Sequence, residues 1–327
     1  MVLILSRKDL QKVLTMRETI SVLEEAFREL VSGKAVMPTR ISIPLPQKSG
    51  WIGIMPAYLE GLNAFSTKIV TVYGGNLSRG LPTTMATVVL NDSETGKMLS
   101  IMDGSYVTAL RTGGLGGLAA KYLSREDSHV VGIFGAGVQA RTQLIALAEV
   151  RNVTRVKVYD PLIERARSFA EEMHHMLAVP VEVCSTNNEA VIGADIVVTV
   201  STSKAPLFNG RLLVPGMHIN AFGNFKPDER ELDTETIKRS RITVDFTEAS
   251  LSEAGDLIIP INEGAISRSQ ITAGLGEIVV GSKVGRSSSE EITLFKSVGL
   301  GIQDCAVASV AYERAIVLGV GTEIDLG

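Results

Sequence analysis

Six residues, Gly135–Ala140, constrain the fold of this 327-residue chain more than any other feature. They read G-x-G-x-x-A, follow an apolar run at 129–134 and open a stretch of helical periodicity at 138–150. In that setting the first glycine permits a tight turn, the second lets the backbone approach a pyrophosphate, and the alanine keeps the helix close to the sheet. The N–H groups and dipole at the start of the helix favour phosphate. We therefore predict a dinucleotide site formed by Gly135, Gly137, Val138 and Gln139, the alternative being a structural glycine turn in some other α/β protein.

The next apolar run, 155–159, ends at Asp160, which lies 25 positions beyond Gly135. A carboxylate at this place accepts hydrogen bonds from ribose hydroxyls and repels a 2′-phosphate. This favours NAD(H), although Arg165, one turn into the next helix, leaves NADP(H) open as a second cofactor. Ser201 and Thr202 follow a third run at 195–200, where the carboxyl end of a strand would face the same crevice. Hydroxyls that cap the next turn are an equally good interpretation of these two residues.

The pattern of predicted secondary structure changes twice along the chain, which predicts two domains. Residues 40–100 contain short β-branched runs between Gly, Pro and Asn turns, as in a mainly antiparallel sheet. A small-residue helix is expected at 103–123, and from 129 onward strands and helices alternate, which is typical of a parallel sheet covered on both faces. The predicted nucleotide-binding domain is 125–296. The other domain is 1–124, completed by 297–327, a segment that begins with a predicted helix.

Composition excludes several classes of function. The net charge is −4 without blocks of like charge, and only 5% of residues are aromatic, so nucleic acid is not an expected partner. The sequence has neither a run of about 18 apolar residues nor a signal-peptide pattern, so we expect no membrane association and a cytoplasmic location. Cys184 and Cys305 are expected to be buried thiols. We predict no metal site, because the histidines lack ligand-like spacing, and we expect His218 to be a packed, hydrogen-bonded residue.

Three cations stand in unexpectedly apolar settings in the first domain. They are Arg40, Lys68 and Arg111, and a charge in a strand or helix that looks buried requires an anionic partner. Each alone would be interpreted as a snorkelling or ion-paired side chain. Together they predict a pocket for a substrate carboxylate.

Several further motifs occur together in one order. They are MPTR (37–40), STK (66–68), GLPTTMA (80–86), MDGSYVTALRTGG (102–114), GAGVQA (135–140), HINAFG (218–223) and GLGIQD (299–304). Over nearly its whole length the chain thereby resembles the ornithine cyclodeaminase/mu-crystallin family. The resemblance implies a fold of the α/β class: a Rossmann-type doubly wound parallel sheet plus a split α/β domain for substrate binding and dimerisation. It also implies a homodimer.

The resemblance also implies roles for particular residues. Arg40, Lys68 and Arg111 would hold the substrate carboxylate, and we assign the catalytic roles to Lys68 and Arg111. Thr112 would lie near the cofactor phosphates. We add Thr83, Phe222 and Gly223 to the predicted cofactor site.

One position departs from the cyclodeaminases of this family. Their G-x-D-x-P pattern supplies an Asp that handles the amino groups of the substrate, and here the Asp position is Phe225. A phenyl ring cannot accept a proton, so cyclodeamination loses its expected acid–base group. Phe225 is instead assigned to substrate binding, where it would keep water from the hydride path. Asp228 and Arg230 nearby are interpreted as turn and surface residues.

The retained cations and the missing Asp together predict a ketimine reductase. Its expected reaction is the NAD(P)H-dependent reduction of Δ1-pyrroline-2-carboxylate to L-proline and of Δ1-piperideine-2-carboxylate to L-pipecolate. Such an enzyme must mainly anchor the carboxylate and place the imine carbon about 3–3.5 Å from the nicotinamide C4. Ornithine cyclodeaminase, an alanine dehydrogenase-like enzyme and a non-catalytic ligand-binding protein stay open as alternatives.

Overall fold

The computed structural model describes residues 1–326, and the chain divides into two compact units. The first unit is Met1–Arg111 together with the residues from Leu300 onward, and the second is Thr112–Gly299. The sequence placed the first boundary at 124/125, whereas the structure divides the chain inside helix α3 (Gly104–Leu123). The reason is local packing within the second unit. Gly113 lies against the backbone of Thr142, where any larger side chain would collide with it.

The second unit is built on an eight-stranded sheet in the order β10-β9-β8-β11-β12-β15-β13-β14, and every pairing in it is parallel. Its strands are β8 (Val130–Phe134), β9 (Arg155–Tyr159), β10 (Val181–Val183), β11 (Ile196–Thr199), β12 (His218–Ala221), β13 (Arg241–Val244), β14 (Ile271–Gly274) and β15 (Thr293–Lys296). Its other α-helices are α4 (Val138–Val150), α5 (Ile163–Leu177), α6 (Asn187–Val191), α7 (Thr234–Arg239), α8 (Thr247–Glu253), α9 (Gly255–Asn262) and α10 (Leu275–Val279).

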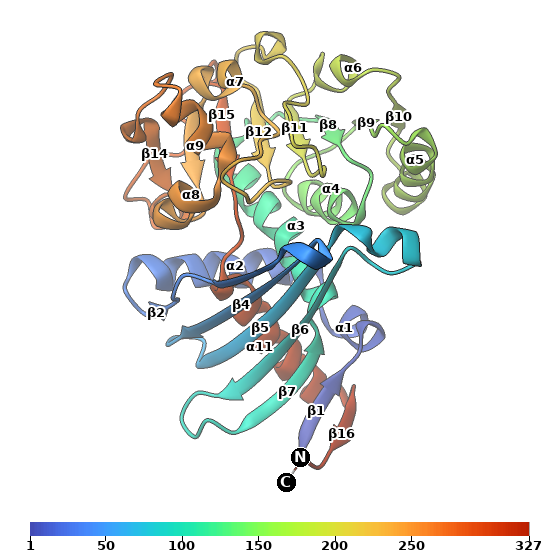
Figure 1. Ribbon diagram of the computed structural model, residues 1–327, viewed down its shortest axis with the longest axis vertical. Helices are drawn as coiled ribbons and strands as arrows, with labels where there is room; N and C mark the ends of the chain where they lie inside the picture. Colours follow the sequence, from blue (N-terminus) through green and yellow to red (C-terminus); the bar gives the residue numbers. More distant parts are fainter. Residues whose placement is uncertain (327) are drawn as a thin grey trace. The chain divides into compact units, whose positions relative to one another are not determined.

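Two hydrophobic cores lie on the two faces of this sheet. Successive residues of β11 alternate between them, as a pleated strand requires: Ile196 and Val198 belong to the core that contains α4 and α5, and Val197 belongs to the core that contains α6, α7 and α9. Figure 1 shows the corresponding arrangement of helices and strands. The unit is therefore a doubly wound Rossmann-type sheet, and the predicted α/β fold is confirmed.

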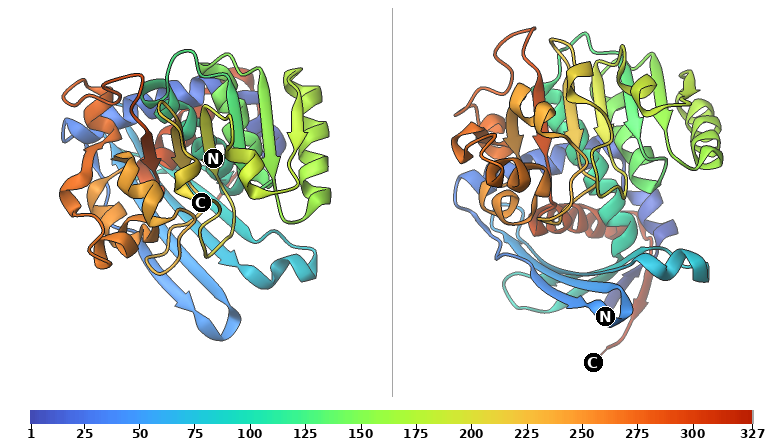
Figure 2. Two further views of the ribbon diagram at one scale, coloured as in Figure 1. Left: turned by 90° about the horizontal axis from the view of Figure 1, so that it is seen from above. Right: turned by 45° about the horizontal axis from the view of Figure 1, so that its top comes forward.

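The first unit is also built on an eight-stranded sheet. Seven strands run in the order β16-β1-β7-β6-β5-β4-β2, and β3 pairs with β4. The strands are β1 (Val2–Leu5), β2 (Ala35–Val36), β3 (Ile41–Leu45), β4 (Gly50–Leu59), β5 (Ala64–Tyr73), β6 (Thr84–Asp92), β7 (Met98–Asp103) and β16 (Thr322–Ile324). All pairings except β1 with β7 are antiparallel. Figure 2 shows that the sheet is curved and that α11 (Gly301–Leu318) lies on its concave side.

The remaining helices of this unit are α1 (Arg7–Val13) and α2 (Met16–Val31). Thr15 caps α2, since its Oγ1 accepts a hydrogen bond from the Glu18 N–H. Strand β4 contains Pro56. The structure accommodates this proline between the two stretches of β4 that pair with β3 and with β2. Among residues 1–326, no helix is long and apolar enough to cross a membrane.

Candidate functional site

The glycine turn lies where β8 ends and α4 begins. Gly135 has φ +97°, a conformation that favours glycine, and a Cβ there would lie 2.9 Å from the carbonyl oxygen of Val200. Gly137 is the N-cap of α4, and nothing lies within 4 Å of the position that its Cβ would take. The turn therefore leaves a bare backbone surface at a helix N-terminus, which fits the pyrophosphate of a dinucleotide.

Asp160 follows β9 and lies against this turn. Its Oδ2 accepts a hydrogen bond of 2.9 Å from the Ala136 N–H, and its Oδ1 accepts one of 2.9 Å from the Leu162 N–H. Each carboxylate oxygen retains acceptor capacity beyond these bonds. Asp160 thus stabilises the turn and is half-exposed beside it, where a ribose could bind.

The segments that follow β11 and β12 meet at one buried carboxyl group, Glu231. Its Oε1 accepts from the backbone N–H (2.8 Å) and hydroxyl (2.6 Å) of Ser201, and its Oε2 accepts from the Gly223 N–H (3.0 Å). Phe222 donates its N–H to Thr199 O at the end of β11. Ser201, Phe222 and Gly223 therefore lie at one edge of the sheet, the edge that also carries the glycine turn. Thr202 is exposed next to Ser201.

The predicted cations of the first unit converge on Asp304, a residue to which the sequence analysis assigned no role. Lys68 Nζ lies 2.5 Å from Asp304 Oδ2, and Arg111 Nε lies 3.1 Å from Oδ1. Arg111 also donates through Nη1 to Gln303 Oε1 at 2.5 Å. Lys68 is 1% exposed and Asp304 is fully buried. β5, α3 and α11 position these three charged groups.

The cluster carries more positive than negative charge. Burial, reinforced by the positive charges of Arg111 and Arg40, lowers the pKa of Lys68 to about 7 against the attraction of Asp304. This places Arg40 within electrostatic reach of Lys68. A second anion would relieve the repulsion between Lys68 and Arg111, which share one carboxylate, so the cluster fits a carboxylate ligand.

Other predicted site residues have local contacts of their own. Thr83 belongs to the first unit, where its carbonyl accepts from the Tyr73 N–H. Thr112 is buried, and its carbonyl accepts from Gln143 Nε2. Phe225 is half-buried against the core that contains α6, α7 and α9.

His218 is fully buried, as expected, and does not reach solvent. Its Nε2 lies 2.9 Å from Asn220 Oδ1 and its Nδ1 lies 3.0 Å from Thr293 Oγ1. Burial lowers the pKa of His218 to about 3. Both cysteines are free and buried, and burial raises the pKa of Cys184 to about 11 and of Cys305 to about 12.

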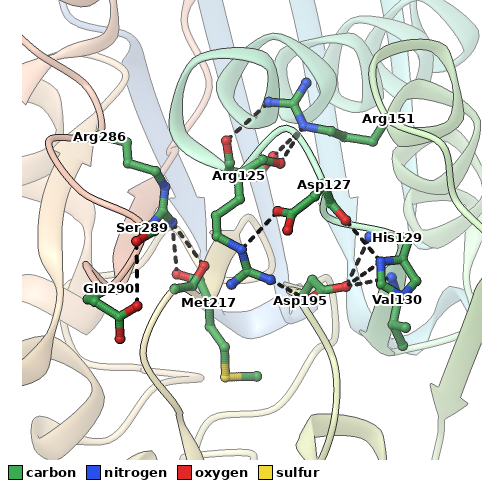
Figure 3. Close-up of polar contacts among 12 residues, drawn as sticks. Arg125, Asp127, His129, Val130, Arg151, Asp195, Met217, Arg286, Ser289 and Glu290 are labelled. Carbon is green, nitrogen blue, oxygen red and sulfur yellow. Dashed lines mark hydrogen bonds and ion pairs between the residues drawn. The ribbon is translucent and has the colours of Figure 1, made fainter.

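A second polar cluster lies at the opposite edge of the parallel sheet, where β8 and β11 begin (Figure 3). Asp195 accepts a hydrogen bond from Arg125 Nη2 (2.7 Å) through Oδ1, and from the backbone N–H groups of His129 and Val130 through Oδ2. His129 Nδ1 lies 3.5 Å from the same carboxylate, a long-range partner that sequence spacing did not reveal. Arg151 donates to the Ala120, Lys121 and Ser124 carbonyls at the end of α3. These contacts are structural, and within residues 1–326 no group of three or more His, Cys, Asp and Glu residues could hold a metal ion.

Sequence reasoning missed Asp304, Gln303 and Glu231. A signal for Asp304 existed, since an Asp inside the mainly apolar stretch 301–311 requires a cationic partner. Glu231 had no such signal, because it stands in a polar segment together with Asp228, Glu229 and Arg230.

Comparison with known proteins agrees with this geometry. The family model described as the ornithine cyclodeaminase/mu-crystallin family matches residues 2–317. The Δ1-pyrroline-2-carboxylate reductase of Bacillus cereus is 39% identical over 324 residues, which cover 99% of each chain. The structure of the Thermococcus litoralis Δ1-pyrroline-2-carboxylate reductase in complex with NADH and L-proline is 46% identical, with a TM-score of 0.97, and the match covers 99% of this chain and 100% of that chain. An archaeal alanine dehydrogenase dimer with bound NAD is 38% identical, with a TM-score of 0.94 over 100% and 99% of the two chains. This chain belongs to the ornithine cyclodeaminase/mu-crystallin family.

Proposed function

We propose that this protein reduces Δ1-pyrroline-2-carboxylate to L-proline with NADH, and Δ1-piperideine-2-carboxylate to L-pipecolate in the same way. The observation that carries the proposal is the buried cluster in which two cations, Lys68 and Arg111, pair with one carboxylate, Asp304, while the positive charge of Arg40 acts on Lys68. The excess positive charge of this cluster would attract the substrate's carboxylate, which is attached to the imine carbon. The similarity of this chain to the Δ1-pyrroline-2-carboxylate reductases of Bacillus cereus and Thermococcus litoralis supports the same reaction.

The residues of the chain have simple tasks in this reaction. The three cations hold the substrate carboxylate and so orient the ring, an effect of positioning. The glycine turn, Asp160 and the Ser201 and Gly223 segments would hold the cofactor, which supplies the hydride to the imine carbon. The imine nitrogen carries a proton before the hydride arrives and becomes the amine of the product. Phe225, in place of an acid, offers no group for the deamination of a diamine.

The first prediction concerns the reaction itself. Purified protein is expected to oxidise NADH when Δ1-pyrroline-2-carboxylate is supplied and to leave NADH unchanged without it, as followed by absorbance. Ornithine serves as the control substrate, because Phe225 cannot replace the acid–base group of a cyclodeaminase. Release of ammonia from ornithine at a comparable rate would contradict the proposal. Tight binding of imines without NADH oxidation would identify a non-catalytic binding protein.

Alanine dehydrogenase activity is a second candidate, favoured by the similarity to the archaeal alanine dehydrogenase. The same cation cluster would suit the carboxylate of pyruvate. Ammonia-dependent oxidation of NADH with pyruvate, at an efficiency above that with the cyclic imine, would select this activity.

NAD(H) is the proposed cofactor because Asp160 lies beside the turn. Replacing Asp160 with alanine should weaken NADH binding and narrow the preference over NADPH, because the ribose hydroxyls lose an acceptor and a 2′-phosphate no longer meets a negative charge. Loss of the bond to Ala136 would loosen the turn as well. Fluorescence titration with both cofactors measures the effect, and Glu164→Ala, at an exposed helix residue nearby, is the control. An unchanged NADH dissociation constant would remove Asp160 from the cofactor site.

We also propose a homodimer, formed through the outer face of the first unit's sheet. On this face Ile54 lies between Ile41 of β3 and Ile69 of β5, and Ile43 pairs with Ile52. These side chains form a contiguous apolar surface that is exposed in the single chain: the exposed fractions are 55% for Ile41, 40% for Ile43 and 45% for Ile69. An exposed apolar patch of this kind is typical of an interface. A second copy of this chain is the proposed occupant, in keeping with the dimer formed by the archaeal relative.

Ile69→Lys is expected to convert the dimer to a monomer, because it places a charge in the centre of the apolar face. Light scattering coupled to gel filtration gives the mass. The control is Val317→Lys, at an 81% exposed valine near the end of α11, which should leave the mass unchanged. A wild-type protein that is monomeric at micromolar concentration would exclude this dimer.

The cytoplasm is the proposed location. Support comes from the two free thiols, which suit a reducing compartment.

A further inference from the structure

We propose that Glu231 is a positioning residue for the cofactor, and that its ionised form holds the Ser201 and Gly223 segments in the arrangement that binds NADH. The inference rests on the proposed function, because it takes these two segments as part of the NADH site. This role requires no contact between Glu231 and cofactor or substrate. It acts through the backbone that it fixes.

The geometry makes Glu231 a link between two strand ends. Three donors converge on its carboxyl group, two from Ser201 after β11 and one from Gly223 after β12. The contact with Gly223 is so close that any side chain at position 223 would collide with the Glu231 oxygens. The segment after β11 also reaches the glycine turn, since Val200 O and the Ser201 backbone lie against Gly135. A change at Glu231 is therefore expected to affect the glycine turn as well as the Ser201 and Gly223 segments.

The charges around Glu231 do not balance when it is ionised. The charged groups that act on it are Asp256 of α9 and Lys296 of β15, and all three side chains are fully buried. Asp256 accepts from the backbone N–H groups of Glu231 and Leu232, and its Oδ2 lies 2.7 Å from Lys296 Nζ. Two carboxyl groups thus share one ammonium group. The ion pair of Lys296 is with Asp256, whereas the three hydrogen bonds to Glu231 come from uncharged donors.

Protonation would weaken the link. An ionised carboxylate accepts all three hydrogen bonds, whereas a protonated one has an O–H in place of one acceptor oxygen, and that oxygen can no longer hold its donors equally well. Burial, reinforced by the negative charge of Asp256, raises the pKa of Glu231 to about 7. NADH affinity should then rise as the pH increases through that region.

The test compares NADH binding by wild-type protein and Glu231→Gln across pH 5.5–8.5, measured by fluorescence titration. Glutamine resembles the protonated acid, because it has one acceptor oxygen and one donor group. We expect NADH to bind Glu231→Gln about tenfold more weakly at pH 8.5, a difference that closes toward pH 5.5. The matched control is Glu229→Gln, which removes a carboxylate that pairs with Lys204 and Lys226 in the same segment and should leave the wild-type pH profile unchanged.

A second variant keeps the test decisive if Glu231→Gln does not fold. Asp256→Asn removes the neighbouring negative charge and should move the midpoint of the pH profile to lower pH by at least about half a unit. Wild-type affinity that does not vary with pH, or a difference between wild type and Glu231→Gln that is the same at every pH, would overturn the role of Glu231 and leave the proposed function intact. Failure of wild-type protein to bind NADH at any pH would overturn the proposed cofactor, and this role with it.

Discussion

Replacing Arg111 with methionine is expected to lower kcat/KM for the cyclic imine by at least about tenfold. Methionine keeps much of the bulk but removes the guanidinium, and a charge-assisted hydrogen bond contributes about 1.5–3 kcal/mol. About 1.4 kcal/mol corresponds to one decade in rate. Asp304 stays paired with Lys68 in this variant, so the loss of folding stability should be smaller than the about 3–5 kcal/mol expected when a buried charge loses its sole partner.

The informative measurement is a pair of values on the same folded variant, the imine kinetics and the NADH dissociation constant. NADH affinity should stay at the wild-type value, because the proposed site of the cofactor phosphates is the glycine turn, which belongs to the other unit. Arg7→Met, at an exposed arginine of the first unit, is the matched control for the loss of a guanidinium. Imine kinetics equal to wild type would remove Arg111 from the substrate site. Equal damage to imine and NADH binding would instead assign Arg111 a structural role alone.

Acid is expected to destabilise the protein in part through His218. Its folded-state pKa of about 3 lies below the ordinary value near 6.5, so the unfolded chain takes up the proton first. The stabilising contribution is therefore complete above about pH 6.5 and is lost progressively as the pH falls toward 3. Between pH 7 and pH 4 this single group should lower the free energy of unfolding by about 3 kcal/mol.

His218→Gln removes the titrating group, so this part of the pH dependence should be absent. Urea unfolding of both proteins at pH 7, 5.5 and 4 gives the difference, in which contributions of other groups, such as Glu231, cancel. Because glutamine cannot reproduce both imidazole contacts, the variant should be less stable at pH 7 and approach wild type at pH 4. His175→Gln, at an exposed histidine, should keep the wild-type slope. A constant gap between wild type and His218→Gln at all three values would show that His218 does not titrate as described.

The sequence predicted the nucleotide-binding half of the fold well, because its order is local. The expected bounds of α4 (138–150) and β9 (155–159) coincide with the structure, since each element carries its own periodicity and the glycine turn marks its place in the sheet. The order of strands was beyond such reasoning. β15 lies between β12 and β13 although it follows β14 in the chain, and no local pattern encodes that insertion.

The candidate site was predictable where a residue type is unusual in its surroundings. Lys68 and Arg111 stood out as charges among apolar residues, but their common partner did not, because 236 residues separate Lys68 from Asp304. An internal ion pair and a substrate clamp were alternative interpretations of Arg111. The structure contains the ion pair, and the excess of positive charge around it supports the clamp.

The long separation between Lys68 and Asp304 has a consequence for biosynthesis. A ribosome releases the chain from its N-terminus, so β5 emerges long before α11 has been made, and the ammonium group of Lys68 has no buried carboxylate to meet. Burying that charge without a partner would be costly, so the sheet of the first unit is expected to fold only after α11 has been synthesised. The second unit is the uninterrupted segment 112–299, which contains every strand of its own sheet and can fold earlier. The nucleotide-binding half is thus expected to become protease-resistant on the ribosome first. A nascent chain stalled before residue 300 should retain a digestible N-terminal segment.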